Sequence, residues 1–330
     1  MKALVCNRFG SPGDCLELVD VALPEPGPGE AVVAVSHVGL NFHDTLVVAG
    51  KHVVQPQPPF SPGSEYAGTV LSVGPDVMVP RVGDRVVGNE EYGCARAAVL
   101  VRADRVTVLP DDVQEQDAAA ILVAYSTAYH ALVQRANLRP GETLVVLGAA
   151  GGVGSAAVDV GALLGARVIA GASTAERATS ALRRGAHETF SYGGDGNVKD
   201  AIKRLTGGVG ADVVFDPVGG TVAEAAVRAV AWGGRYLVVG FAAGAIPRLA
   251  LNIPLVKGSS VIGVFLGEFI RRHRALHEEN LRTIFAWATA GRLRPHVHGV
   301  LPLERGAEAL DLLAGGRADG KLLLRVGQSL

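Results

Sequence analysis

A cluster of glycines between two apolar runs constrains the fold of this 330-residue chain more than any other feature. The first run, residues 143–147, and the second, residues 168–172, each have the length and composition of a buried strand. The glycines at 148, 151, 152 and 154 separate the first run from an alanine- and leucine-rich segment of helical length. This order predicts a βαβ unit with a phosphate-binding turn at its first junction.

The residues of the turn have the pattern of a dinucleotide fingerprint whose first position is alanine, Ala149. Glycine at the second position lets the backbone approach a pyrophosphate, and glycine at the third lets the helix pack closely on the strand. The N-terminus of the helix offers free N–H groups and a positive dipole to the phosphates. We therefore expect cofactor phosphates to bind at Ala150, Gly151, Gly152, Val153 and Gly154.

Composition indicates a soluble globular protein of two domains, because 48% of residues are hydrophobic, 19% are charged and the net charge is −1. Residues 144–166 carry only one charge, Asp159, but their clustered glycines favour a buried α/β core over a membrane span. Near-neutral charge argues against nucleic-acid binding. Three cysteines without paired spacing, and an N-terminus without a signal-peptide pattern, predict reduced thiols in a cytoplasmic protein.

The chain changes character along its length. Up to about residue 120, short apolar segments alternate with Pro and Gly turns, which is typical of a β-barrel or sandwich; residues 41–49 form a short helix. We expect two helices over 115–135, one long helix over 268–290, an amphipathic helix over 303–314 and a last strand over 321–325. Six strands alternating with helices predict a doubly wound parallel sheet: 143–147, 168–172, 188–192, 212–215, 235–240 and 260–266.

Three further segments give the chain a family resemblance. Residues 38–44 (VGLNFHD), 62–68 (PGSEYAG) and 82–86 (VGDRV), together with the glycine turn, resemble the medium-chain dehydrogenase/reductase superfamily. The resemblance is closest to its zinc-independent NADPH:quinone oxidoreductase (ζ-crystallin-like) branch. It implies a GroES-like β-barrel catalytic domain over 1–122 and 267–330, and a Rossmann NADPH-binding domain over 123–266.

The chain departs from the zinc-dependent relatives at their metal ligands. Where those relatives place a cysteine and a histidine, this sequence has residues 39–41 and Ser64, although Glu65 is retained. The histidines at 37, 43 and 52 are not spaced as a usual ligand set, so we expect no metal. Without a Lewis acid, reduction of an already electrophilic carbon is favoured over alcohol oxidation.

The end of the second strand of the βαβ unit predicts the cofactor. An enzyme that prefers NAD usually has an acid there for the ribose 2′-hydroxyl, but this chain has Ser173 and Thr174, followed by Arg177. Hydroxyls and an arginine suit a 2′-phosphate, so we predict NADPH over NADH. The resemblance places Tyr192 on the other side of this phosphate, and Arg317 and Lys321 are expected to add charge.

The resemblance also implies the residues around the nicotinamide. Asn41 and Thr127 would contact the nicotinamide and its ribose, and Val218 would line the path from adenosine to ribose. The backbone near Phe241 and Phe265 would hold the carboxamide side. Reduction of a conjugated C=C bond also needs a proton source. Tyr125, His43 and His52 are candidates, Asp44 is a weaker one, and bulk water is an alternative; Asn41, Asp44 and Tyr125 are taken as the catalytic set.

Three functions remain open on the sequence. The first is an NADPH-dependent quinone reductase acting on a small electrophilic molecule. The second is an enoyl or acryloyl thioester reductase, with the basic residues 271–274 available for the phosphates of coenzyme A. The third is a non-catalytic NADPH-binding protein. The long apolar segment 259–266 reads as an unpaired edge strand, so we expect a homodimer that extends the sheet.

Overall fold

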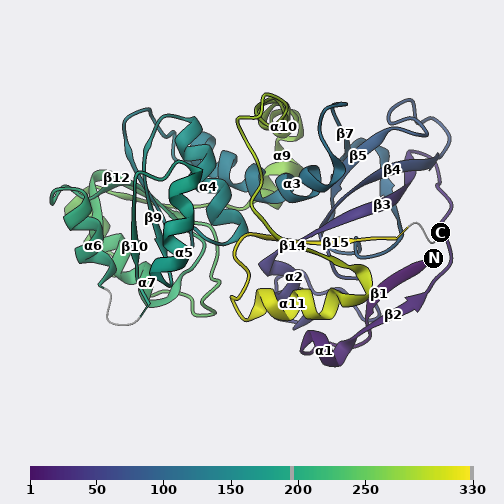
Figure 1. Cartoon of the computed structure of the whole chain (residues 1–330), viewed down its shortest axis with the longest axis horizontal. Helices are drawn as coiled ribbons and strands as arrows, with labels where there is room; N and C mark the ends of the chain where they lie inside the picture. The colour runs from purple at the N-terminus through teal and green to yellow at the C-terminus, as the bar shows by residue number, and fades with distance from the viewer. Residues whose placement is uncertain (194–196, 328–330) are drawn as a thin grey trace. The chain divides into compact units, whose positions relative to one another are not determined.

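The computed structural model describes residues 1–193 and 197–327. The chain divides into two compact units: Met1–Val123 with Leu281–Leu330, and Ala124–Asn280 (Figure 1). The boundaries therefore fall inside helices α3 (Glu115–Tyr129) and α10 (Arg274–Thr289). The second unit ends at Asn280, whereas the sequence analysis placed its end at residue 266, so the second boundary lies 14 residues later than expected.

The first unit is built on β-sheet, as expected, and its strand pairs are antiparallel except for β14 with β15, which is parallel. Its main sheet has the order β14-β15-β3-β4-β5-β7, with β6 pairing with β3, and β1 and β2 form a separate pair. Two register shifts in β3, at 32–33 and 35–37, bend this long strand so that β4 can follow it. The strands are β1 (Lys2–Cys6), β2 (Leu16–Asp20), β3 (Glu30–Leu40), β4 (Glu65–Val73), β5 (Arg85–Asn89), β6 (Ala98–Arg102), β7 (Val106–Val108), β14 (Val297–Pro302) and β15 (Lys321–Arg325).

Short helices close the first unit. The core joins side chains of the N-terminal strands to Leu310, Leu322 and Leu324, so the C-terminal tail packs in this unit. The helices are α1 (Pro12–Cys15), α2 (Phe42–Val48), η1 (Ala103–Arg105), η5 (Leu303–Arg305) and α11 (Gly306–Ala314).

The second unit contains the six-stranded parallel sheet that the sequence predicts, in the order β10-β9-β8-β11-β12-β13. The chain moves outward from β8 to β10 and then crosses back to β11, so the strand order reverses beside β8. Ligands bind at such a reversal, outside the carboxyl ends of the strands. The strands are β8 (Thr143–Val146), β9 (Arg167–Ala172), β10 (Glu188–Ser191), β11 (Ala211–Asp216), β12 (Val230–Val238) and β13 (Ser260–Gly263).

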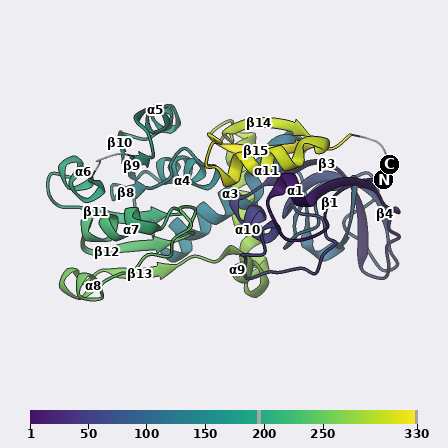
Figure 2. The same cartoon turned by 90° about the horizontal axis from the view of Figure 1, so that it is seen from below.

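Helices cover both faces of this sheet. A side chain at Gly161 of α4 would meet Leu144 and Val168, so α4 packs on the face to which those residues point. Val145 and Ile169 point the other way and share a core with α6 and α7. The helices are α4 (Gly152–Leu163), α5 (Ala175–Ser180), η3 (Ala181–Arg184), α6 (Val198–Leu205), α7 (Gly220–Ala226), η4 (Val227–Ala229), α8 (Asn252–Lys257) and α9 (Leu266–Arg272), and Figure 2 shows α4 and α5 on one side of the strands.

Two helical segments differ from expectation. Helix α3 continues without interruption into a π-helix, His130–Arg135, where two helices were expected. The single helix expected over 268–290 is broken into α9 and α10 at His273, whose φ and ψ are −133° and 49°. At the break, Phe269 stacks on His130 with ring centroids 3.9 Å apart, so contacts between helices replace the simple helical period.

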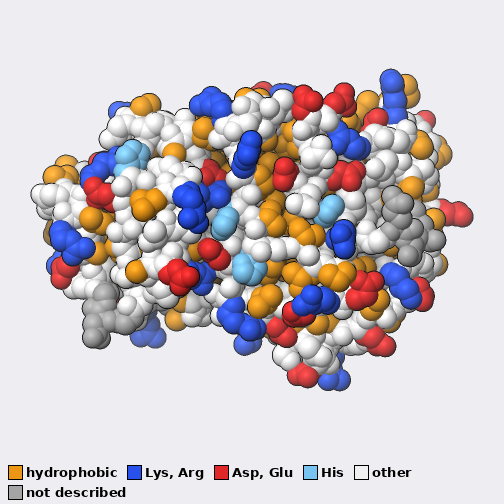
Figure 3. All heavy atoms as spheres, viewed as in Figure 1, with side chains coloured by type: hydrophobic (Ala, Val, Ile, Leu, Met, Phe, Trp, Pro, Cys, Tyr) orange, Lys and Arg blue, Asp and Glu red, His pale blue; other side chains and the backbone are white. Residues whose placement is uncertain are grey.

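Side chains of both charge signs occur together on one face of the molecule. Figure 3 shows Lys and Arg side chains interspersed with Asp and Glu on the face that it presents. The described residues include no helix long and apolar enough to cross a membrane. Among the described residues on the face in Figure 3, the basic side chains form no continuous patch of the kind that binds nucleic acid.

Candidate functional site

The glycine turn of the second unit has the geometry of a phosphate cradle. Gly148 has a φ of +62°, which few side chains tolerate, and a Cβ at Gly154 would lie 2.0 Å from the carbonyl oxygen of Gly148. The turn therefore needs glycine at both positions. Helix α4 begins directly at Gly152, with Gly151 at its N-cap, so the N–H groups of its first turn lack intrahelical acceptors and face the turn. The residues expected to hold phosphates thus fit a dinucleotide.

Ser173, Thr174 and Arg177, which were expected to contact the 2′-phosphate of the cofactor, lie directly after β9. The side chain of Thr174 accepts a hydrogen bond from the N–H of Arg177 at 3.3 Å and so caps α5. Tyr192, which follows β10, accepts a hydrogen bond through its hydroxyl oxygen from the N–H of Gly148 at 3.1 Å. Burial raises the pKa of Tyr192, while the Gly148 N–H and the charge of Arg177 oppose that shift. Tyr192 therefore joins the phosphate turn to the Arg177 side of the site.

The loops after β11 and β12 form the next part of the same edge. A Cβ at Gly148 would lie 3.0 Å from a methyl group of Val218, and a Cβ at Gly219 would lie 2.9 Å from the ring of Phe241. Val218 and Phe241 thus lie beside glycines of the carboxyl edge. Asp216 shapes this loop: its Oδ1 accepts the N–H groups of Val218 at 2.7 Å and Gly219 at 3.0 Å.

Tyr125 is placed differently from what a proton donor requires. Its ring is buried, and its hydroxyl donates to Oδ2 of Asp159 at 2.6 Å and accepts from Arg184 at 3.2 Å. Asp159 and Arg184 also form an ion pair. Burial, reinforced by Asp159, raises the pKa of Tyr125 well above its ordinary value. This geometry favours a structural triad over a proton-donor role for Tyr125.

A second polar cluster lies in the first unit, where α2 follows β3. The Nδ2 atom of Asn41 donates to Oε1 of Glu65 at 2.7 Å and to the hydroxyl of Ser64 at 3.3 Å, and its Oδ1 accepts from Lys321 at 2.6 Å. Lys321 also pairs with Glu65, whose other oxygen accepts the N–H of Val123 at 2.7 Å. Asn41 is therefore held at both ends of its amide.

This arrangement corrects the role expected for Lys321. The side chain is only 4% exposed and its ammonium is bound to Glu65 and Asn41, so it offers no free charge to a 2′-phosphate. The charge was correctly recognised in the sequence, but its carboxylate partner lies 256 residues away in the chain. Arg317 is exposed and donates to the carbonyl of Asp311 at 3.4 Å.

The first turn of α2 carries the remaining proton-donor candidates. Asp44 is buried, and its Oδ2 accepts the N–H of Asn41 at 2.7 Å. Its Oδ1 lies 3.3 Å from Nε2 of His43, whose ring is 5.5 Å from that of His52. Burial raises the pKa of Asp44, with His43 the largest opposing influence. The structure therefore brings Asn41, Asp44, His43 and His52 together.

Three further residues expected to contact the cofactor lie in the second unit. Thr127 is half-buried in α3, and Phe265 is an exposed residue at the N-cap of α9. Ser173 is exposed at the end of β9, where a Cβ at Gly193 would clash with its carbonyl oxygen at 2.1 Å. The chain after β10 thus runs directly past Ser173.

The donor atoms do not suit a metal ion. Among residues 1–193 and 197–327, no group of three or more His, Cys, Asp or Glu side chains converges as metal ligands do. At the positions where zinc-dependent relatives have ligands, Asn41 and Ser64 are hydrogen-bonded to each other, and Asn41 accepts the ammonium of Lys321. An ammonium among these side chains is incompatible with a bound cation.

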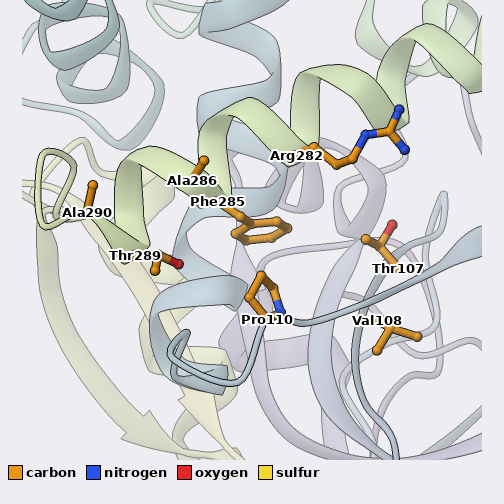
Figure 4. A pocket seen from close by; sticks show the side chains of 8 residues that line it. All are labelled: Thr107, Val108, Pro110, Arg282, Phe285, Ala286, Thr289 and Ala290. Carbon is orange, nitrogen blue, oxygen red and sulfur yellow. The ribbon is translucent and has the colours of Figure 1, made fainter.

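A separate apolar groove lies on the first unit. Figure 4 shows Phe285 on α10 pointing toward Pro110, and the groove encloses about 390 Å³. None of the residues expected in the site lines it, and it holds one charged side chain, Arg282. Apolar volume alone therefore does not mark the chemistry here.

Sequence reasoning missed two residues of these clusters. Asp216 follows the strand expected over 212–215, and an acid followed by Pro-x-Gly-Gly is a loop-shaping signal. Glu65 was recognised only as part of a motif, and its pairing with Lys321 had no local signal.

Comparison with known proteins places these features in a family. An alcohol dehydrogenase GroES-like domain model matches residues 27–111, and a zinc-binding dehydrogenase model matches residues 152–282. Quinone oxidoreductase-like protein 2 of Rattus norvegicus is 36% identical, over 98% of this chain and 91% of that protein. Human quinone oxidoreductase is 31% identical to this chain, over 98% of this chain and 97% of the human protein. The chain belongs to the medium-chain dehydrogenase/reductase superfamily, in its zinc-independent quinone oxidoreductase branch.

Solved structures agree with this membership. The structure of Escherichia coli quinone oxidoreductase complexed with NADPH matches this one with a TM-score of 0.92 and 28% sequence identity. The match covers 98% of this chain and 100% of the E. coli chain. The expected GroES-like and Rossmann domains of the superfamily are confirmed. The "zinc-binding" description of the second model belongs to the wider superfamily, since the side chains at the ligand positions of this member do not suit zinc.

Proposed function

We propose that this protein is an NADPH-dependent oxidoreductase that reduces quinones or other conjugated electrophiles without a metal. The observation that carries the proposal is the carboxyl edge of the parallel sheet, where the Gly148–Gly154 cradle, Tyr192 and Arg177 surround one face of the strand reversal. NADPH bound there would supply a hydride. Its presence in the E. coli quinone oxidoreductase complex supports this cofactor.

The chain's own residues bind and orient in this scheme. The amides at the start of α4 would hold the pyrophosphate, and Arg177 with Tyr192 would hold the 2′-phosphate. Within the first unit, Lys321 and Glu65 hold the amide of Asn41 in one orientation. Because binding groups are fixed before ligand arrives, little reorganisation is needed for transfer.

Cofactor choice is tested at Arg177. We expect Arg177→Ala to raise the KM for NADPH by about 10- to 100-fold, the worth of one charge-assisted phosphate contact, and to leave that for NADH unchanged. Arg183→Ala, an exposed arginine of the adjacent η3, is the matched control. Equal effects of Arg177→Ala on both cofactors, or a wild-type preference for NADH, would contradict the proposal.

Acceptor class is tested by NADPH oxidation with 1,2-naphthoquinone, a conjugated ketone and crotonyl-CoA. The structure gives the thioester no particular support: Arg271 and Arg272 are bound to Glu268, and Arg274 donates to Glu278 at 2.9 Å. These exposed ion pairs are weak, so they neither withhold the arginines from the phosphates of coenzyme A nor mark a site for them. No turnover with any acceptor would favour a non-catalytic NADPH-binding protein.

We also propose a homodimer in the cytoplasm. The three cysteines of the chain are free thiols, as expected in a reducing compartment. Strand β13 lies at the end of the sheet, and exposed apolar side chains, including Trp232, Leu255 and Val261, lie on it and near it. A second copy that covers this edge would remove the liability of an unpaired apolar strand.

A further inference from the structure

Asp216, the last residue of β11, is a carboxylate enclosed by donors of its own unit. It is 2% exposed. Its Oδ1 accepts the N–H groups of Val218 and Gly219, and its Oδ2 accepts the hydroxyl of Tyr236 on the neighbouring strand β12. Both oxygens are therefore bonded, and the carboxylate joins β12 to the loop that follows β11. Burying a carboxylate is costly unless donors surround it, so this group is a fixed point of the second unit.

The hydroxyl of Tyr236 is the main donor that keeps Asp216 ionised. Burial raises the pKa of Asp216, and the Tyr236 hydroxyl is the largest influence against that shift, ahead of the two N–H groups. Burial, followed by the charge of Asp216, raises the pKa of Tyr236, so the phenol keeps the proton that it donates. Without Tyr236, Oδ2 of Asp216 would have no hydrogen-bond donor among the residues that the structure describes.

The loop that this carboxylate holds packs against the phosphate turn of the same unit. A Cβ at Gly148 would lie 3.0 Å from Cγ2 of Val218 and 3.4 Å from Cγ of Pro217, so both side chains lie directly against the turn. The carbonyls of Pro217 and Val218 accept the N–H groups of Ala242 at 3.0 Å and Ala243 at 2.9 Å. The loop therefore connects the chain after β12 to the turn that begins α4.

The backbone of this loop needs contacts from outside to keep one shape. Gly219 and Gly220 have φ values of +73° and +59°. Glycine loses more conformational freedom on folding than any other residue, so a loop with two glycines is costly to order. The N–H of Gly219 is bound by Asp216, and that of Gly220 by the carbonyl of Ala245 at 3.0 Å. The position of the loop thus depends on Asp216.

We propose that Tyr236 and Asp216 form a positioning pair that sets the affinity of this protein for its dinucleotide, by holding residues 217–219 against the Gly148–Gly154 cradle. This inference rests on the proposed NADPH-dependent function. Both side chains are buried, so the pair acts through the loop and the turn and not by contact with a ligand. Its effect concerns the part that NADPH and NADH share, since the 2′-phosphate is assigned to the residues after β9.

Fluorescence titration of NADPH and NADH tests the pair without turnover. We expect Tyr236→Phe to raise both Kd values by about 5- to 10-fold. This is less than the full worth of a hydrogen bond to a charged group, because the two loop N–H groups stay bound to Oδ1. The ratio of the two Kd values should not change, whereas Arg177→Ala should change it.

Variants of Asp216 test whether its hydrogen bonds carry the effect. Asp216→Asn keeps an oxygen for the two loop N–H groups, and its amide can donate to the hydroxyl oxygen of Tyr236. Its Kd values should therefore lie within about twofold of the wild type, because the hydrogen bonds are conserved. Asp216→Ala removes every acceptor and should raise both Kd values at least as much as Tyr236→Phe does.

Thr206→Val is the matched control for a loss of stability alone. The buried hydroxyl of Thr206 accepts the N–H of Gly210 at 2.8 Å, directly before β11 and at the other end of the strand from Asp216. Thr206→Val and Tyr236→Phe each remove one buried hydroxyl, so both should lower the Tm of the cofactor-free protein. Only Tyr236→Phe should weaken dinucleotide binding.

The outcomes separate this inference from the function beneath it. Unchanged Kd values in folded Tyr236→Phe, or an equal loss of affinity in Thr206→Val, would overturn the inference alone. A Kd that rises for NADPH and not for NADH, or Asp216→Asn that binds as weakly as Asp216→Ala, would do the same. Wild-type protein that binds neither dinucleotide would overturn the proposed function together with the inference.

Discussion

Tyr125 is a phenol whose hydroxyl already has two partners. If it forms a structural triad with Asp159 and Arg184, Tyr125→Phe should lower the free energy of unfolding by about 1–3 kcal/mol, since both partners lose a buried hydrogen bond. Turnover per folded molecule should stay near wild type. Denaturant unfolding and steady-state rates check the two parts, and a 100-fold loss of kcat in a fully folded variant, about the worth of a general acid, would restore Tyr125 to the catalytic set.

His277 of α10 should make the stability of the fold depend on acidity. Burial, followed by the charge of Arg274, lowers its pKa to about 4. The unfolded chain binds that proton near about pH 6.5, so between the two values the unfolded state holds more protons. Above the pKa of the unfolded state, neutral His277 makes its full contribution to the free energy of unfolding. That contribution falls by up to about 3 kcal/mol as the pH drops toward the pKa of the folded state.

Denaturant unfolding from neutral pH down to the folded pKa of His277 tests this. His277→Leu should lose less stability on acidification than the wild type, whereas His298→Leu, at an exposed histidine of β14, should behave like the wild type. A slope remains in the variant, because burial also lowers the pKa of His37, His52 and His130. Identical slopes for wild type and His277→Leu would rule out the assignment.

At the scale of elements, the parallel sheet was the most predictable part. Each of its six strands is a short apolar run between turn residues, and all six lie where the sequence placed them. A strand buried on both faces needs apolar residues whichever neighbours it has, so local composition is enough. The sequence therefore predicts that each strand exists, but not every boundary: β12 begins at Val230, whereas the strand was expected from residue 235.

The helices show where local pattern fails. The break between α9 and α10 at His273 carries no proline or glycine. It accompanies the contacts of Phe269 with the rings of His130 and His277, which come from α9's neighbours in space. Periodicity in one segment cannot report a partner that lies about 140 residues away.

At the scale of the whole molecule, the exposed edge of the second unit predicts self-association. Figure 2 shows β13 and α8 beside each other at one end of the sheet, and Leu255 and Val261 are 78% and 43% exposed. We expect the wild type to be a dimer by multi-angle light scattering, and Leu255→Glu with Val261→Glu to be a monomer with an unchanged unfolding transition. A charge buried in an interface without a partner opposes association strongly.

The control for this prediction is another exposed apolar residue of the same unit. Val209, which is 69% exposed in the turn after α6, should tolerate Val209→Glu without any change of mass. A wild-type monomer at micromolar concentration, or a dimer that survives both charges, would show that this edge is not the interface.

The sequence by itself determined the family, the parallel sheet and the phosphate turn, because each depends on residues close together in the chain. Gly148 and Gly154 follow from backbone sterics within one turn, and the missing acid after β9 lies in one segment. Only the tertiary structure decided which charged side chains are free. Lys321 is paired with Glu65, Tyr125 is bound to Asp159, and Asp44 is shared by a cap and a histidine. A charge shows its residue type in the sequence, but its partner, burial and pKa are set by atoms that folding brings from distant segments.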